Sequence, residues 1–366
     1  MTFSIIAKDA LHLLLNPQET AKLDDYHWQD FIRFLRFNDL MGTMASQLAR
    51  FDVKINSRFA EKHLNAALIY SSRQAQQVIN EAGGLKHLLN DYGIEPIFLK
   101  GSAYILCEDF NANGRVMSDV DILVDKKQIP EVERVLKENG WKEKALNSYD
   151  ENYYRQWSHE LPPFRHLTTG TTLDIHHTLI PPITGIILPV DNILNEVESA
   201  KYDTLSLQLE WRLLHCIIHF FFNEGYEKPL RDIWDIKCLF LKLEGQKELE
   251  QFFRLAHDLG LRKEVLYAVH SVVYCFGSVS SSLIDSAQKA DFKFTLSEQL
   301  FFNTVIKNIL LLRHSNVDSM LTKLAAFIMM SRGHIKKMPL KILLPHIATK
   351  AYRSVVKLIL GRYHFD

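Results

Sequence analysis

Apolar residues recur along this chain at two different spacings, and the change of spacing divides it into regions. Over residues 1–90 they recur every three or four positions, as at Trp28 and Phe31, which is typical of amphipathic helices. A long run rich in Ala, Gln and Leu continues this spacing, with a weak break at Gly83-Gly84. The pattern predicts an N-terminal helical region that packs against the part of the chain that follows.

Between residues 91 and 204, short apolar runs alternate with single helices. The run 97–100 predicts a buried strand that ends in a Gly-Ser pair and leads into a helix, and 118–124 predicts a second strand. A helix is expected over 129–138, followed by a hairpin over 164–177. This alternation predicts an α/β arrangement around a small mixed sheet.

From residue 205 onward the spacing is again helical, and no further strand is expected. The last stretch differs in composition, because 321–366 carries nine Lys and Arg residues, a single acid, Asp366, and interleaved apolar runs. We therefore expect an α+β, helix-dominated fold in four parts. These are an N-terminal helical region (1–90), an α/β core (91–204), a C-terminal helical domain (205–320) and a basic amphipathic helical tail (321–366).

Composition and charge narrow the class of protein without identifying it. The 366 residues include 43 basic and 43 acidic ones, so the global positive charge of many nucleic-acid-binding proteins is absent. The four cysteines are scattered without a CxxC pair, which indicates neither a zinc site nor a disulfide framework. The first residues lack the pattern of a signal peptide, and no apolar run is long enough to span a bilayer. We expect a soluble, cytoplasmic protein.

Two motifs in the α/β core carry candidate chemistry. Asp119 and Asp121 stand at alternate positions of a predicted strand, so their carboxylates point to the same side. Like charges this close repel each other unless a cation lies between them, and oxygen ligands suit Mg²⁺. The Gly101-Ser102 turn offers backbone N–H groups at a helix start, where a triphosphate would be stabilised. Together the motifs indicate phosphoryl or nucleotidyl transfer.

In this order, the motifs resemble those of a known superfamily. Leu99-Lys100-Gly101-Ser102, followed by Arg115-x-x-Ser118-Asp119-Val120-Asp121, is similar to the signature of the DNA polymerase β-like nucleotidyltransferases, and within them to a group of largely uncharacterised bacterial members. The resemblance covers roughly two thirds of the chain and is strongest over 97–125. It implies a nucleotidyltransferase core whose Gly-Ser and Asp-x-Asp motifs are completed by a third carboxylate on a later strand.

Asp174 is the candidate for the third carboxylate. It lies mid-strand between Leu173 and Ile175, where an unpaired charge is costly to bury, and a metal shared with the other two Asp residues would offset that cost. The alternative is an Asp that faces solvent on an edge strand. His176 shares its face by alternation, so it would line the same groove, either contacting a phosphate or the acceptor or serving as a hydrogen-bonded structural residue.

The resemblance further implies a nucleotide-binding set around these carboxylates, which comprises Lys100, Gly101, Ser102, Arg115, Ser118 and His176. A guanidinium suits bidentate phosphate binding, and the alternative for Arg115 is a surface pair with Glu108 or Asp109. The Lys100 side chain would either reach a phosphate or cap the end of its strand.

Two residue pairs in the C-terminal part each have a functional and a structural interpretation. His215 and His219 lie one helical turn apart, but the Glu of a zinc HExxH motif and a third ligand are missing, so no metal is expected there. Arg231 and Asp235 belong to a Leu-Arg-x-x-x-Asp element similar to one in the same family. They would either contact the nucleotide or form an ion pair on the helix surface.

As the resemblance implies, the expected activity is transfer of a nucleoside monophosphate from an NTP such as ATP to an acceptor hydroxyl, with release of pyrophosphate. Asp119 and Asp121 would hold two Mg²⁺ ions, and Asp174 would complete the metal site. A small molecule, a sugar or a protein is favoured over nucleic acid as the acceptor. A catalytically silent NTP-binding or scaffold protein of the same fold is the first alternative.

The basic tail supports another alternative, a membrane-surface accessory protein of envelope or polysaccharide biosynthesis. A basic amphipathic segment is able to lie on an anionic membrane surface, which would place the protein peripherally at the inner membrane, or to bind another polyanion. The competing interpretation is a helical pair that packs its apolar stripe on the bundle and leaves its lysines solvated.

Overall fold

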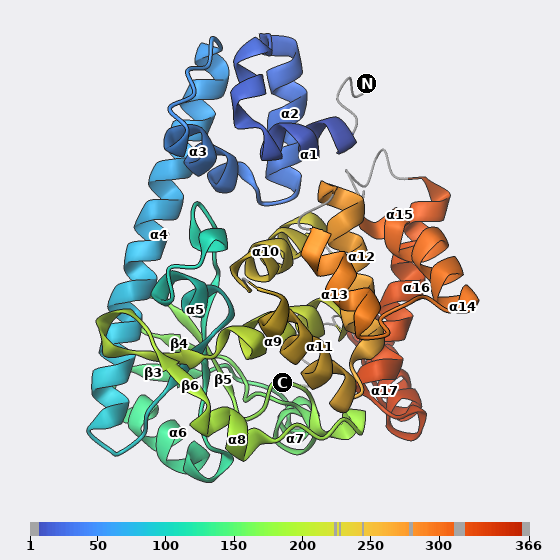
Figure 1. Ribbon diagram of the computed structural model, residues 1–366. Helices are drawn as coiled ribbons and strands as arrows, with labels where there is room; N and C mark the ends of the chain where they lie inside the picture. Colours follow the sequence, from blue (N-terminus) through green and yellow to red (C-terminus); the bar gives the residue numbers. More distant parts are fainter. Residues whose placement is uncertain are drawn as a thin grey trace.

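The computed structural model describes residues 7–222, 225–226, 228–243, 245–277, 281–310 and 319–360. N-terminal helices, one seven-stranded sheet with its own helices, and a C-terminal group of helices follow one another along the chain (Figure 1). The α+β, helix-dominated class predicted from the sequence is confirmed.

The N-terminal helices end in one long helix that runs beside the sheet. They are α1 (Ala7–Leu15), α2 (Asp25–Phe37), α3 (Met41–Arg50) and α4 (Arg58–Asn90). The predicted break at Gly83-Gly84 is wrong, because α4 is continuous over 33 residues. Each glycine disfavours the helix by only about 1 kcal/mol, and buried Ala82 and Leu85 hold this part of α4 against the core.

The sheet has the order β3-β4-β5-β2-β1-β7-β6. Its strands are β1 (Ile97–Leu99), β2 (Asp119–Leu123), β3 (Trp141–Glu143), β4 (Phe164–His166), β5 (Thr172–His176), β6 (Val197–Ser199) and β7 (Leu205–Leu207). The sheet is mixed, because β2 pairs antiparallel with β1 and parallel with β5. Phe98, Ile122 and Ile175 are fully buried, so the middle of the sheet forms part of the core.

Short helices lie between the strands. These are α5 (Lys100–Leu106), α6 (Ile129–Glu138), α7 (Ser148–Trp157) and α8 (Val190–Asn195). The strands and helices expected over 97–177 are thus found close to their predicted positions. Their boundaries follow local signals, such as the proline in the first turn of α6.

The expectation that the chain is helical from residue 205 onward is wrong at its start. Residues 205–207 form β7, which lies parallel to β1 and antiparallel to β6. The Ser206 hydroxyl donates a hydrogen bond to the Phe98 carbonyl oxygen at 3.3 Å. A three-residue strand is too short to show a period in the sequence, and it forms here because the edge of β1 offers a partner.

The C-terminal helices pack on one another and on the sheet. They are α9 (Leu209–Phe222), α10 (Pro229–Lys242), α11 (Gln246–Asp258), α12 (Arg262–Phe276), α13 (Ser281–Lys289), α14 (Leu296–Phe301), α15 (Lys307–Leu310), α16 (Met320–Lys337) and α17 (Leu340–Leu360). The last six residues of the predicted basic tail, 361–366, lie outside the described residues. Within the described part, no helix combines the length and the apolar character needed to cross a membrane.

Candidate active site

The two central strands bring the three predicted carboxylates to one face of the sheet. Asp121 of β2 lies opposite Asp174 of β5 in the parallel pairing, and Asp119 lies opposite Thr172 one step earlier on the same face. Because side chains alternate along a strand, all three carboxylates point to the same side. The register between β2 and β5 therefore creates the cluster that the sequence suggested.

Lys100 provides a cation beside these carboxylates. Its Nζ lies 2.7 Å from Asp121 Oδ1, and its left-handed backbone (φ 45°) turns the chain from β1 into α5. Burial alone would lower the pKa of Lys100, but attraction to Asp121, Glu160 and Asp174 outweighs it, so the pKa is raised. The ammonium thus stays protonated and partly neutralises the cluster.

Asp174 carries the clearest sign of an unmet cation requirement. Its Oδ1 is buried and has no hydrogen-bond partner among the described residues. Burial, followed by repulsion from Asp121 and Glu160, raises the pKa of Asp174 to about 8. Burial and Asp121 also raise the pKa of Asp119, against the opposing effect of Lys100.

Glu160 is a fourth carboxylate at the site, and the sequence analysis missed it. An isolated bridge pairs it with His176, and its Oε2 lies 3.5 Å from His176 Nε2. Burial raises the pKa of Glu160. Attraction to Lys100 opposes this shift, and repulsion from Asp121 adds to it. Glu160 lies in an irregular segment before β4, and no periodicity in the sequence marks it.

The donor set fits a divalent cation. Four carboxylates converge on one lysine, and one buried carboxylate oxygen is left without a partner. Oxygen donors of this kind are the ligands that Mg²⁺ prefers. We conclude that Asp119, Asp121 and Asp174 are able to hold a hard divalent ion.

His176 lies within hydrogen-bond distance of Asp121. Its side chain is fully buried, its Nε2 lies 3.0 Å from Asp121 Oδ1, and burial holds its pKa well below the usual range. Because carboxylates only accept hydrogen bonds, we assign the single proton of the neutral ring to Nε2. His159, Glu160 and His176 form a cluster with metal-ligand spacing, and Nδ1 of His176 has no hydrogen-bond partner among the described residues.

Further imidazoles line the same region. The rings of His159 and His215 lie 5.2 and 6.2 Å from that of His176. His219, one turn after His215 on α9, is exposed on a helix whose residues are otherwise mostly buried. Burial chiefly lowers the pKa of His159 and His215, so both rings are neutral donors or acceptors at neutral pH.

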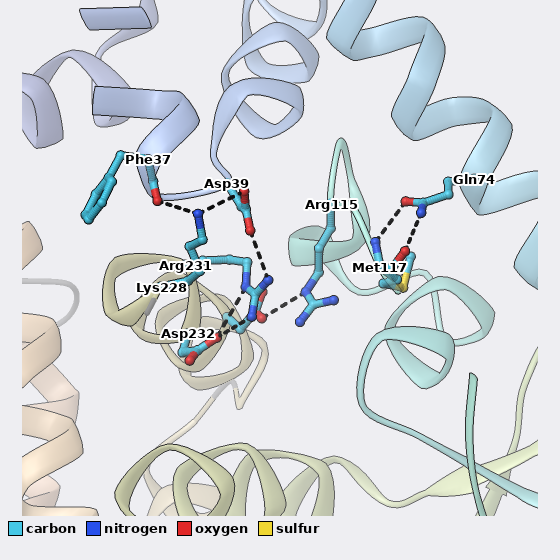
Figure 2. A network of polar contacts seen from close by, with 9 residues as sticks. Phe37, Asp39, Gln74, Arg115, Met117, Lys228, Arg231 and Asp232 are labelled. Carbon is cyan, nitrogen blue, oxygen red and sulfur yellow. Dashed lines mark hydrogen bonds and ion pairs between the residues drawn. The ribbon is translucent and has the colours of Figure 1, made fainter. Parts of the chain in front are cut away.

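The Gly-Ser turn is buried beneath other side chains. The Ser102 hydroxyl donates to the Leu99 carbonyl at 2.7 Å and lies 3.3 Å from that of Asp121. A Cβ at Gly101 would overlap the side chain of Met117, which explains the glycine. Gln74 of α4 holds Met117 by both backbone groups, donating to its carbonyl and accepting from its N–H (Figure 2).

Arg115 is anchored by a buried ion pair with Asp235. Its Nε lies 3.0 Å from Asp235 Oδ2, and this pair is almost completely buried. The alternative surface pairs with Glu108 or Asp109 are therefore wrong. Glu108 pairs instead with Lys201 at 2.7 Å, and buried Asp109 pairs with Arg212 at 3.2 Å and with Lys242 at 2.5 Å.

The i, i+4 ion pair between Arg231 and Asp235, one of the two interpretations that the sequence left open, is also wrong. Arg231 contacts Asp232 at 3.1 Å and Asp39 at 3.5 Å, on the side that faces the N-terminal helices (Figure 2). Asp235 instead accepts from Arg115 and from Asn111 at 3.1 Å. Asp235 thus links α10 to the loop between the Gly-Ser and Asp-x-Asp motifs.

The structure accordingly separates the predicted site residues into two groups. Lys100, Asp119, Asp121, Asp174 and His176 meet in one cluster. Ser118 is exposed next to Asp119, whereas Gly101, Ser102 and Arg115 are engaged by neighbouring protein groups. Their roles in nucleotide binding stay predictions.

A small cavity of about 120 Å³ opens beside Asp119. Its polar lining includes Gln74, Gln77, Glu81, Ser118, Asp119 and Thr171. The Thr171 hydroxyl donates to Glu81 at 2.8 Å and accepts from Gln77 at 3.2 Å, which fixes the hairpin turn against α4. No lysine or arginine is among the described residues that line this cavity.

Residues 24–277 match the model of a family described as uncharacterised nucleotidyltransferases, and the chain belongs to this family. The matched segment runs from α2 to α12 and includes the whole sheet and the carboxylate cluster. The resemblance predicted from the sequence is thereby confirmed. The comparisons with curated proteins and with solved structures gave no match.

Proposed function

We propose that the protein transfers a nucleoside monophosphate from an NTP to an acceptor hydroxyl, with pyrophosphate as the leaving group, in a Mg²⁺-dependent reaction. The observation that carries this proposal is the β2–β5 register, which sets Asp121 opposite Asp174 with Asp119 on the same face. Membership in a nucleotidyltransferase family supports it independently. ATP is the donor to test first.

The carboxylates would hold the metal. Asp119 and Asp121 would bind the donor-side ion, and Asp174 would join them at the acceptor side. When bound, two Mg²⁺ ions supply charge stabilisation for the attacking and leaving oxygens. His176 keeps one Asp121 oxygen oriented by donating from Nε2 at 3.0 Å, so the other oxygen stays available as a ligand.

Lys100 would exchange partners during binding. Its ammonium contacts Asp121, and it would move to the triphosphate oxygens when that carboxylate serves as a metal ligand. Exposed Ser118 lies next to Asp119 and is a further candidate phosphate contact. This exchange would couple metal binding to nucleotide binding.

Proton transfer would involve Asp174. The acceptor oxygen forms a bond to the α-phosphorus, the bond to the bridging oxygen breaks, and pyrophosphate departs with that oxygen. The acceptor's proton would move to Asp174 Oδ1, which is buried and has no partner among the described residues. A divalent cation bound beside Asp174 would keep this carboxyl ionised at neutral pH, and only the ionised form is able to accept the proton.

We further propose that the acceptor is a small molecule, a sugar or a protein side chain rather than a long nucleic acid. The cavity beside Asp119 offers amide, hydroxyl and carboxylate groups and no described cation. Such a lining suits a neutral, hydroxyl-bearing acceptor, whereas a nucleic-acid path needs basic residues along the phosphate backbone.

The test is incubation of the protein with α-labelled NTPs, Mg²⁺ and a cell lysate. The Asp121→Asn variant should lose label transfer by about 100-fold or more, since a metal site supplies several kcal/mol of stabilisation. Asp125→Asn is the matched control, because Asp125 caps the Lys127 N–H at 2.9 Å outside the cluster. NTP binding without transfer in the wild type would overturn the proposal and favour a silent binding protein.

A further inference from the structure

Helix α16 exposes an apolar face although its sequence is rich in basic residues. Its outward side chains are Met320, Leu321, Leu324, Phe327, Met330 and Ile335, which we call the α16 apolar face. Leu321, Leu324 and Phe327 are exposed by 69, 53 and 60%. At 100° per residue these positions lie on one side of the helix, which runs along an edge of the molecule (Figure 1).

Two basic residues of α16, Arg332 and Lys336, instead point toward the protein. Arg332 lies 2.6 Å from buried Glu264 and donates to the Phe221 carbonyl at 2.9 Å. Lys336 lies 3.2 Å from the same Glu264 oxygen. On α17, Lys350 pairs with Asp150 at 2.7 Å. For α16, the expectation of a stripe packed on the bundle is confirmed for Ala325 and Met329, which are buried in the core. The expectation of solvated basic residues is wrong for Arg332 and Lys336, which are paired with Glu264.

An apolar face of this extent is unfavourable in water unless something covers it. Contiguous exposed apolar patches usually mark interaction sites, whereas single exposed apolar residues need no explanation. The helix has 18 residues, so it is roughly 27 Å long. That length allows several turns to lie along a partner surface.

Charge distinguishes between the candidate partners. The sequence from 319 to 360 contains no Asp or Glu, and Lys323 on α16 and Lys341 at the start of α17 are exposed. A second copy of the chain would bring lysines against lysines at this face. An anionic lipid surface instead supplies both the apolar phase and the opposite charge.

We propose that the α16 apolar face lies in the interface of an anionic membrane, with Lys323 and Lys341 at the level of the lipid headgroups. The segment 278–366 lies beyond the part of the chain that matches the nucleotidyltransferase family. Membrane association is therefore separable from transfer chemistry, and its test does not depend on the proposed activity.

The test is flotation of the full-length protein with vesicles of phosphatidylcholine alone or with added phosphatidylglycerol. The wild type should float with the anionic vesicles and much less with neutral ones. The double variant Leu324→Ser/Phe327→Ser should bind the anionic vesicles at least about tenfold more weakly than the wild type, because two large apolar side chains no longer enter the membrane interface.

The control is Ile69→Ser/Tyr70→Ser on α4, whose side chains are similarly exposed, by 55 and 58%. This control should float like the wild type. Lys323→Glu/Lys341→Glu, which keeps the apolar face, should lose the preference for anionic vesicles. Circular dichroism of every variant verifies that the fold is retained.

Two results would overturn the proposal. One is equal flotation of the wild type and the Leu324→Ser/Phe327→Ser variant, including the case in which neither floats. The other is a dimer, detected by light scattering, that is lost in this variant while no protein floats, which would assign the face to self-association.

Discussion

Asp121 and Asp174 lie directly opposite each other in the parallel pair of strands β2 and β5. One carboxylate is held by Lys100 and His176, whereas the other has a buried oxygen with no partner among the described residues. Protein groups therefore offset the repulsion between these carboxylates only in part, and the pKa of Asp174 is raised as a result.

Stability of the metal-free protein should fall as pH rises from 6.5 to 8. The pKa of Asp174 is raised to about 8, so in this range the folded protein holds a proton that the unfolded chain has released. Since stability decreases with pH wherever the folded state binds more protons, deprotonation of Asp174 destabilises the fold. Below 6.5 the buried histidines, with lowered pKa, oppose this trend.

The measurement is the melting temperature against pH in the presence of a chelator. Asp174→Asn should flatten the profile between pH 6.5 and 8, and saturating Mg²⁺ should flatten that of the wild type. Asp191→Asn, at an exposed position on α8, is the control. An unchanged slope in Asp174→Asn would show that this carboxyl does not carry the effect.

Replacement of Lys100 should change metal and nucleotide binding in opposite directions. Lys100→Met removes a charge-assisted contact with Asp121, which competes with a divalent ion and is worth about 1.5–3 kcal/mol. Mg²⁺ should then bind about 10-fold to 100-fold more tightly without nucleotide, while the affinity for the NTP decreases. Calorimetric titration measures both.

Lys142→Met is the matched control for that experiment, because Lys142 is exposed on β3, the edge strand of the sheet. If Lys100→Met tightens Mg²⁺ binding but leaves NTP binding unchanged, Lys100 only caps the strand and neutralises Asp121. That outcome would remove it from the nucleotide-binding set.

Loss of Asp235 should destabilise the protein strongly. Asp235→Ala leaves the buried guanidinium of Arg115 without its partner, and breaking a buried ion pair on one side costs about 3–5 kcal/mol. Urea unfolding measures the free-energy change. Glu131→Ala removes a solvent-exposed partner of Arg134 and should change the free energy of unfolding far less. Equal effects of the two substitutions would contradict a structural role for the Arg115–Asp235 pair.

The contact between Gly42 and Gly114 should tolerate no side chain. A Cβ at Gly42 would overlap the Gly114 carbonyl oxygen, a backbone atom that cannot rotate away. Gly42→Ala should therefore lower the free energy of unfolding by about 1–3 kcal/mol. Gly83→Ala, where a Cβ meets nothing, should raise it by about 0.5–1 kcal/mol. A neutral Gly42→Ala would mean that α3 and the loop carrying Arg115 do not pack as described.

The carboxylate motif could be predicted from the sequence because its physical basis is local. Side-chain alternation puts Asp119 and Asp121 on one face of any strand that contains them, whatever the rest of the chain does. The helix starts at Asp24 and Pro130 are local in the same sense, since a cap or a proline acts within one turn. The carboxylate motif, together with the Gly-Ser pair, also carried the resemblance to nucleotidyltransferases.

Other features required the tertiary structure, because they join segments far apart in the chain. The pairing of Arg115 with Asp235, the approach of Glu160 to His176 and the short strand β7 depend on neighbours that no local period encodes.

The α16 apolar face shows most clearly which features depend on the sequence alone and which depend on the tertiary structure. The sequence by itself determined that this helix would carry both basic and apolar residues, just as it determined the common face of Asp119 and Asp121. Only the packed structure decided that Arg332 and Lys336 would point inward, because the buried carboxylate of Glu264 needs a cationic partner. This orientation of the helix leaves Leu324 and Phe327 exposed.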